Sequence, residues 1–194
     1  MLPPGSRLKI SELSKSYASG PVPIREALQT LVGEGLVVIH PHKGASVQLI
    51  EPRIIEDMLE VRRALEPYIN AAFVRNASIN VIRELEAIED EFEKFQDAGD
   101  IGSYVRADQE FHTQIYRMSG NAEAMYIINR HFSFIGAHLS RYGQSAERMQ
   151  QVRSEHRRQI AALKDGDATT AAEIAILHLA NAIRDLREIA SRSA

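Results

Sequence analysis

The stretch Asp108-Gln109-Glu110-Phe111-His112 decides how the rest of this chain of 194 residues is interpreted. Around it, apolar residues recur every three or four positions, which predicts a helix with one buried face; they are Ile101, Tyr104, Val105, Phe111, Ile115 and Met118. Asp108 and His112 fall on that same face, one helical turn apart, so their side chains lie one above the other. A buried carboxylate is costly unless it is paired, and a metal ion shared with the histidine would remove that cost.

Two further histidines occupy equivalent positions. His156 and His178 each lie on an apolar stripe, within helices predicted at about 146–164 and 168–190 that are joined near Gly166. In an antiparallel helical hairpin, residues at equal distances from the turn lie side by side, so the two imidazoles face each other. Together with Asp108 and His112 they predict a buried site of three histidines and one aspartate. For each residue alone, the alternative is a core side chain with ordinary partners.

The composition limits which chemistry is available. The chain has no cysteine, which excludes disulfides and thiolate ligands and leaves His, Asp and Glu as metal ligands. Imidazole suits zinc first, with nickel and iron also allowed, and the single carboxylate leaves manganese open. No apolar run approaches the roughly 18 residues of a membrane span, and the start has no secretory pattern, so we expect a cytoplasmic protein.

The first 48 residues have their own organisation. A helix at 11–17, a second helical stripe from Ile24 to Val32 and two strands at 36–39 and 45–47 follow one another. This order is typical of a winged helix-turn-helix, whose second helix enters the major groove of DNA. Residues 1–48 carry a charge of +2 and the remainder −5, which fits a DNA-facing part on an acidic body.

The remainder of the chain predicts helices only. Residues 48–52 form a connector, and Pro52 is well placed in the first turn of the next helix. Pro67 is expected to kink or break that helix. Helical stripes then continue to the end, so residues 52–192 are predicted to form an all-α bundle of about six helices.

The first part resembles the DNA-binding domain of GntR-family transcription regulators. The matching segments run from Leu2 to Leu8, from Pro23 to Leu28 and from Gly33 to Val37, followed by Lys43-Gly44-Ala45 in the wing. The family has one more helix before the Pro-Gly turn, and this chain begins too late to contain it, so we expect a truncated or weakly stabilised domain. The family also commonly has an arginine where this chain has Pro21, which removes one expected DNA contact.

Two basic residues are the predicted DNA contacts of this domain. Arg25, near the start of the recognition helix, is expected to bind a phosphate or a guanine edge, against the alternative of an exposed arginine paired with a glutamate. Lys43, in the wing, is expected to contact a phosphate, against the alternative of a solvated loop lysine.

The second part resembles the FCD ligand-binding domain of the FadR subfamily of GntR regulators. Matching segments are Glu60-Val61-Arg62, Asp108-x-x-Phe111-His112, Ser119-Gly120-Asn121, Glu155-His156 and His178-Leu179. The resemblance implies a divalent metal on Asp108, His112, His156 and His178, and a small organic acid whose carboxylate reaches the metal. Arg62 either turns inward to meet that carboxylate or forms a surface ion pair with Glu66.

Three functions remain open on this basis. The first is a homodimeric regulator that binds operator DNA and responds to a small carboxylate effector at the metal. The second is a metalloenzyme acting on a small acid or ester with the same ligands, although no glutamate is expected beside them as a general base, and we do not expect an enzyme. The third is a helical interaction module with a structural cation.

Overall fold

The computed structural model describes residues 2, 4–41, 43–49 and 51–192. They form two compact units, Met1–Glu51 and Pro52–Ala194. Position 42 in the predicted wing turn and position 50 in the predicted connector lie outside the described residues. The predicted class is confirmed, since a small winged helix-turn-helix precedes a bundle of helices.

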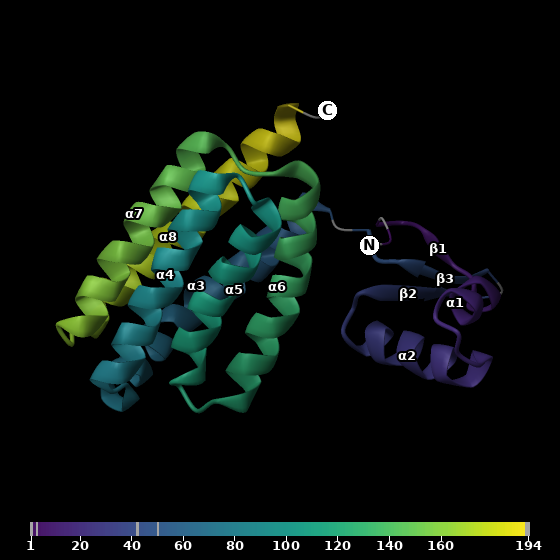
Figure 1. Ribbon diagram of the computed structural model, residues 1–194, viewed down its shortest axis with the longest axis horizontal. Coiled ribbons are helices and arrows are strands. Elements are labelled where there is room, and N and C mark those ends of the chain that lie inside the picture. The colour runs from purple at the N-terminus through teal and green to yellow at the C-terminus, as the bar shows by residue number, and fades with distance from the viewer. Residues whose placement is uncertain (1, 3, 42, 50, 193–194) are drawn as a thin grey trace. The chain divides into compact units, whose positions relative to one another are not determined.

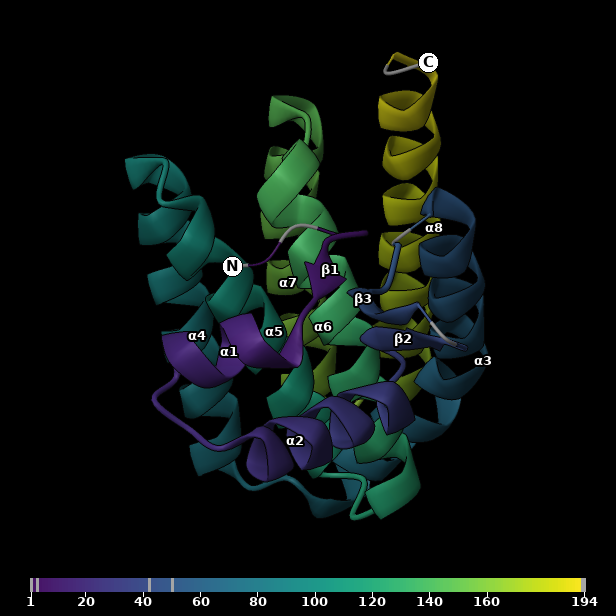
Figure 2. The same cartoon turned by 90° about the vertical axis from the view of Figure 1, so that its right-hand side faces the viewer.

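The N-terminal unit contains two helices and a three-stranded antiparallel sheet (Figure 2), in the order β1 (Arg7–Leu8), α1 (Ile10–Ser16), α2 (Pro21–Gly33), β2 (Val37–His40) and β3 (Gly44–Val47). Strand β3 lies in the centre of the sheet, between β1 and β2. The two helices and the sheet share one small core, made of Leu8, Ile24, Leu28, Val37 and Ala45. Helix α2, which the sequence analysis identifies as the recognition helix, begins at Pro21, where a missing N–H costs nothing.

Strand β1 is absent from the sequence prediction. It has two residues, Arg7 and Leu8, which pair with Ser46 and Ala45 of β3. A segment this short shows no alternation of apolar and polar residues, so no periodic signal exists to detect. Leu8 contributes its side chain to the core of the unit, and this burial explains why the segment is held against the sheet.

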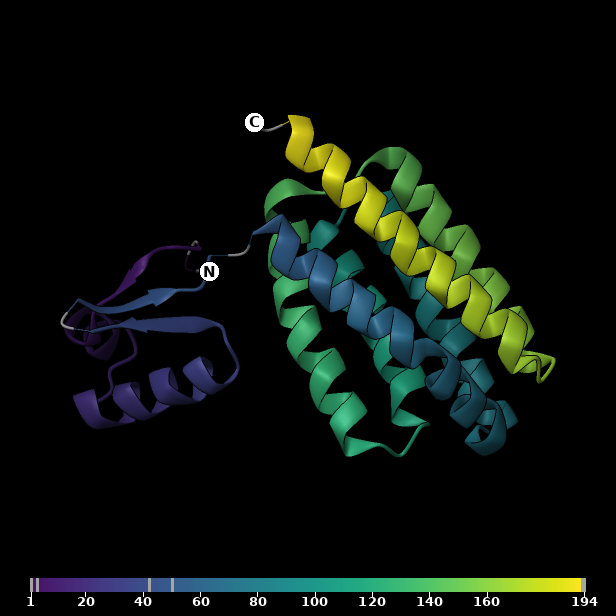
Figure 3. The ribbon, with the colours of Figure 1, turned by 180° about the vertical axis from the view of Figure 1, so that it is seen from behind.

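The second unit is a bundle of six helices in the described part of the chain (Figure 1). The helices are α3 (Pro52–Asn76), α4 (Ile79–Ala98), α5 (Ile101–Arg117), α6 (Ala122–Tyr142), α7 (Ala146–Lys164) and α8 (Ala168–Arg192). Figure 3 shows α3 and α8 lying side by side over much of their length. No helix among the described residues is long and apolar enough to cross a membrane.

Of the two outcomes expected at Pro67, a kink or a break, the break does not occur. Helix α3 continues through it for nine further residues, to Asn76. A proline inside a helix removes one backbone hydrogen bond and crowds the preceding turn, at a cost of about 3 kcal/mol. Ile69 and Phe73, just beyond the proline, are both 0% exposed, and burying such side chains contributes about 1.5–3 kcal/mol each. Packing of the second half of α3 therefore outweighs the local penalty.

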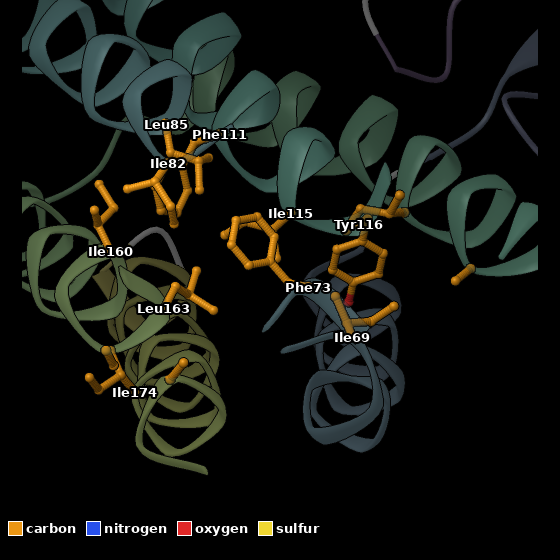
Figure 4. Packing of buried hydrophobic residues seen from close by; sticks show 14 of the residues in the cluster. Ile69, Phe73, Ile82, Leu85, Phe111, Ile115, Tyr116, Ile160, Leu163 and Ile174 are labelled. Carbon is orange, nitrogen blue, oxygen red and sulfur yellow. The ribbon is translucent and has the colours of Figure 1, made fainter. Parts of the chain in front are cut away.

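The main core of the bundle joins side chains from all six helices (Figure 4). Its largest fully buried members include Phe73 of α3, Leu85 of α4 and Phe111, Ile115 and Tyr116 of α5. Phe111 belongs to the stretch that opened the sequence analysis, and its burial fixes the rotation of α5. Because Asp108 and His112 lie within one turn of Phe111, the same rotation turns them into the bundle.

Two turns set the positions of the helices that carry the site. Gly99 ends α4 with a positive φ of 69°, and Asp100 then caps α5 by accepting a hydrogen bond from the Ser103 N–H at 3.1 Å. Gly166, with φ of 76°, lies between α7 and α8. A left-handed residue is needed at each of these points, and glycine adopts that conformation without strain.

Candidate metal centre

The four residues predicted as metal ligands come together inside the bundle. Asp108 and His112 lie on α5, His156 on α7 and His178 on α8. Each offers one ligand atom, and these atoms all lie within 4.8 Å of one another. The three imidazoles are buried, with exposures of 7% or less, and the Asp108 side chain is 15% exposed.

The imidazole nitrogens that face Asp108 have no hydrogen-bond partner. Nε2 of His112 lies 3.9 Å from Asp108 Oδ1, and Nε2 of His156 lies 3.8 Å from the same oxygen. Both distances exceed a hydrogen bond, and both Nε2 atoms are fully buried without a partner among the described residues. A buried polar atom without a partner is costly, so two that converge on one carboxylate indicate a shared ligand.

Carboxylates behind the imidazoles fix the orientation of two of them. Glu89 of α4 is 0% exposed, and its Oε2 lies 2.9 Å from Nδ1 of His156. On the other side of the site, Glu155 Oε2 lies 2.9 Å from Nδ1 of His178. A carboxylate only accepts, so Nδ1–H donates in each pair and the lone pair is on Nε2. This arrangement orients a histidine for metal binding and increases its basicity.

Arg148 completes the support around His178. Its guanidinium is 2% exposed and donates to Glu155 Oε2 at 2.8 Å and to the backbone carbonyl of His178 at 2.9 Å. Asn181 donates to the other oxygen of Glu155. The charge of Glu155 is thereby balanced, and the carboxylate that accepts from His178 Nδ1 is held in place by Arg148 and Asn181.

The protonation states also favour a metal. Burial holds the pKa of His112 and of His178 well below the usual value, and the positive charges of Arg62 and Arg148 act in the same direction. Neutral imidazoles carry the lone pair that a metal requires. Burial raises the pKa of Asp108, against the opposing influence of His156 and the two arginines. A cation at Asp108 would stabilise its ionised form.

The dimensions fit a first-row divalent ion. A metal–nitrogen bond of about 2.1 Å places tetrahedral ligand atoms about 3.4 Å apart. The two Nε2 atoms lie 3.9 and 3.8 Å from Asp108 Oδ1, and all four donor atoms lie within 4.8 Å of one another. The donors therefore need to close around an ion by about half an ångström at Asp108 and by up to about 1.4 Å elsewhere.

A cavity of about 50 Å³ opens from the ligands. Asp108, His112 and His178 line it, together with Arg62 and Phe132. Arg62 is 2% exposed, so it is buried and does not lie on the helix surface; its guanidinium lies 5.1 Å from the centre of the Phe132 ring. Its Nε and Nη2 atoms have no hydrogen-bond partner among the described residues.

Glu66, one turn further along α3, is also buried and has other partners. It accepts hydrogen bonds from the Tyr116 hydroxyl at 2.9 Å and from the Asn70 amide at 3.1 Å. Burial raises the pKa of Glu66, although the charge of Arg62 opposes the shift.

Two histidines of α6 are buried near this cavity. The sequence analysis offers no ligand role for either of them. His131 is 6% exposed and burial lowers its pKa to about 4, with Arg62 and Arg130 acting in the same direction. His138 lines the cavity, and burial lowers its pKa against the opposing charge of Asp185. His138 therefore faces the same cavity as the metal ligands, but it lies six residues further along α6 than Phe132.

In the N-terminal unit, the two predicted DNA contacts are exposed and border one hollow. Arg25 of α2 and Lys43 of the wing turn line it together with Arg7 and Lys9. The Arg7 guanidinium donates to the backbone carbonyl of Lys43 at 2.8 Å and so ties the wing turn to β1. Four basic side chains around one depression form a positively charged surface of the kind that phosphate backbones contact.

Sequence reasoning missed three residues of the site, namely Glu89, Arg148 and Glu155 as supporting groups. A signal for each was present. Glu89 lies on the apolar stripe of α4, and Arg148 and Glu155 lie on that of α7, at helical spacing from buried neighbours. A charged residue on a buried stripe needs a partner, which is the argument that identified Asp108.

The comparisons with known proteins agree with this architecture. Residues 1–47 match the family model described as bacterial regulatory proteins, gntR family, and residues 57–181 match the FCD domain. The HTH-type transcriptional repressor GlaR of Escherichia coli is 28% identical over 190 residues, which cover 91% of this chain and 84% of that protein. The HTH-type transcriptional regulator McbR of Escherichia coli is 26% identical over 118 residues, covering 61% of this chain and 53% of that protein.

Solved structures show the same fold. The Escherichia coli structure named McbR/YncC superposes with a TM-score of 0.84 at 23% identity, covering 96% of this chain and 89% of that one. A putative transcriptional regulator GntR from Rhodococcus sp. RHA1 gives 0.78 at 17% identity, with the same two coverages. The protein is thus a member of the GntR family of DNA-binding transcription regulators that carries an FCD effector domain.

Proposed function

We propose that this regulator holds a divalent metal on Asp108, His112, His156 and His178 and senses a small organic acid there. The observation that carries the proposal is the pair of buried, unpartnered Nε2 atoms that converge on Asp108. Zinc is the first expectation, and nickel, iron or manganese are compatible with the same donors. The ion, when bound, supplies open coordination positions that accept a carboxylate.

Arg62 is the expected second contact of the acid. Its buried guanidinium faces the cavity beside the ligands, and two of its nitrogens lack a hydrogen-bond partner among the described residues. A buried guanidinium without an acceptor is unfavourable, and a carboxylate is the acceptor whose geometry fits it. The acid would therefore lie between the ion and Arg62, with Phe132 holding the guanidinium plane.

DNA binding is proposed to use Arg25 and Lys43 at the recognition helix and the wing. We expect a homodimer, so that two N-terminal units read two half-sites of an operator. An acid that binds one arrangement of the bundle more tightly than another would change the spacing of those units. The resident ion and its acid would thereby control operator affinity.

The metalloenzyme alternative gains no support. The matched relatives are transcription regulators, and the two glutamates nearest the ligands are engaged with Nδ1 atoms. Glu89 and Glu155 therefore lie behind the imidazoles, on the side away from the ligand atoms. A general base would have to reach a water on the opposite side.

Metal content tests the first part of the proposal. Purified protein should contain about one equivalent of metal by elemental analysis, and His156→Ala should lose it. His131→Ala is the matched control, because it removes another buried histidine that is not a predicted ligand, and it should retain the metal. Equal metal content in the parent and in His156→Ala would refute the proposed ligand set.

DNA binding is tested with duplexes enriched from a random library by the full-length protein. In gel shifts, Arg25→Ala should weaken binding to the enriched duplex by about 1–3 kcal/mol, that is roughly tenfold or more. Lys15→Ala, which removes one exposed charge from α1, controls for the loss of net charge. Equal effects of the two substitutions would contradict a specific role for Arg25.

A further inference from the structure

The cavity is elongated, and its two ends differ in chemistry. Three helices contribute residues seven apart to its wall: Ile55 and Arg62 of α3, Phe132 and Leu139 of α6, and His178 and Asp185 of α8. Seven helical residues span about 10 Å. Arg62, Phe132 and His178 mark the end at the ligands, so Ile55, Leu139 and Asp185 mark the far end.

Side-chain contacts support this direction independently. At the ligand end, the ring centres of His112 and Phe132 lie 5.7 Å apart, and Arg62 lies over Phe132. Near the far end, Arg187 of α8 donates to Glu56 of α3 at 2.8 Å. Helices α3 and α8 therefore run antiparallel along the cavity, with its axis between them.

The middle of the cavity is apolar. Between the two ends, its wall includes aliphatic side chains that offer no hydrogen bond; they are Leu59, Ile135, Leu179 and Ala182. Its volume of about 50 Å³ is that of a few waters, at roughly 10–15 Å³ for each. The space thus suits a thin, unbranched chain of methylene groups and excludes a bulky or polyhydroxylated body.

The far end presents a negative charge. Asp185 lines this end and accepts a hydrogen bond from the Ser145 hydroxyl at 2.8 Å. His138, one residue before Leu139, also lines it, and burial lowers the pKa of His138, which favours the neutral imidazole and leaves the charge of Asp185 uncompensated by it. Gln144 also lines this end, and its Oε1 accepts from the Tyr104 hydroxyl at 2.7 Å. Two hydrogen bonds thus hold the segment between α6 and α7 over the end of the cavity and fix the position of Asp185.

The two ends therefore select opposite charges. At the ligand end, the positive charges of Arg62 and Arg148 face the carboxylates of Asp108, Glu155 and Glu89. A divalent ion would bring the sum of these charges from −1 to +1, which favours the binding of one carboxylate. At the far end, a second carboxylate would meet the half-buried Asp185, where like charges repel more strongly than in bulk water. A hydroxyl or an ammonium group would instead donate to Asp185.

We propose that the effector is a slender monocarboxylate with an apolar middle and a hydrogen-bond donor at its other end, and that Asp185 excludes dicarboxylates. The inference rests on the proposed function, because it takes the metal and Arg62 as the anchor of the first carboxylate. It adds a specificity residue seven positions beyond His178. Discrimination arises from an unfavourable contact with the wrong ligand as well as from a favourable one with the right ligand.

Calorimetric titration of the zinc-loaded full chain tests the proposal. The probes are butyrate and pentanoate, their ω-hydroxy forms, and the dicarboxylates succinate and glutarate. At each chain length, the ω-hydroxy acid should bind tightest and the dicarboxylate weakest, with about a tenfold or larger difference between them. Asp185→Asn should remove this difference, chiefly by improving the dicarboxylate.

Glu173→Gln is the matched control, because it removes the same charge from an exposed position of the same helix. It should leave the order of the probes unchanged. Dicarboxylates that bind the parent protein at least as tightly as the ω-hydroxy acids would overturn the inference while leaving the acid sensor intact. An unchanged order in Asp185→Asn would equally overturn the role of Asp185. Absence of heat from every probe, or binding that persists after zinc removal, would instead refute the proposed function and with it the inference.

Discussion

Replacing Glu89 with glutamine should weaken metal binding without destabilising the metal-free protein. Glu89 accepts a hydrogen bond from His156 Nδ1 at 2.9 Å and is 0% exposed. A hydrogen bond to a charged group contributes about 1.5–3 kcal/mol, roughly twice that of a neutral one. Glutamine keeps an acceptor of the same shape and loses the charge, so about half of that contribution disappears.

The expected loss of metal affinity is therefore about 0.75–1.5 kcal/mol, or roughly three- to tenfold. Its upper limit meets the lower end of the range of about 10–100-fold known for groups that support metal-bound histidines. In the metal-free protein, the substitution is not expected to weaken the fold. Burial raises the pKa of Glu89 because the charged form is poorly solvated, so removal of that charge should leave the melting temperature unchanged or higher.

Competition of the protein with a chelator of known zinc affinity measures the first effect, and calorimetric melting of the metal-free protein measures the second. Glu86→Gln is the control, since it makes the same chemical change on the same helix, where Glu86 forms an exposed ion pair with Lys164. Such a pair contributes about 0–1 kcal/mol, and zinc affinity should not change. Unchanged affinity in Glu89→Gln, or a lower melting temperature of its metal-free form, would refute the reasoning.

Three further outcomes are expected. His131→Gln should flatten the pH dependence of stability, because the pKa of His131 is about 4 in the folded protein and near 6.5 in the unfolded chain. The neutral imidazole contributes fully to stability above pH 6.5, and this contribution is lost as the pH falls from 6.5 towards 4. Melting of the parent and the variant across this pH range measures the difference. Leu85→Ala, at a side chain that is 0% exposed, should lower the free energy of unfolding in urea by about 2–5 kcal/mol. Tyr116→Phe should cost about 1–3 kcal/mol in the same assay, because Glu66 loses a buried hydrogen-bond donor; a change below 0.5 kcal/mol, the usual size at an exposed site, would contradict it.

Periodicity was sufficient to predict the helices of the bundle, because each has a buried stripe several turns long. It also indicated that Asp108 and His112 face inward, since Phe111 and Ile115 belong to the same stripe. It was insufficient at Pro67, where a local rule competes with packing that only the folded chain supplies. Residues far apart in sequence set that outcome, and a single-sequence pattern does not contain them.

The supporting groups of the site show a second limit. Glu89 and His156 are 67 positions apart, and nothing in the spacing of either residue states that they meet. Their partnership follows from the packing of α4 against α7. The sequence shows that Glu89 is a charged residue on a buried stripe, but it does not show that His156 is its partner.

The position of Arg62 on α3 has a mechanical consequence. Arg62 lies ten residues, or about 15 Å, from the start of this helix at Pro52, and the DNA-binding unit ends at the preceding residue, Glu51. No proline or glycine occurs at 53–62, so this part of the helix has none of the usual causes of a kink and is expected to move as one stiff segment. A displacement of Arg62 would therefore be carried along the helix to Pro52, the first residue of the second unit.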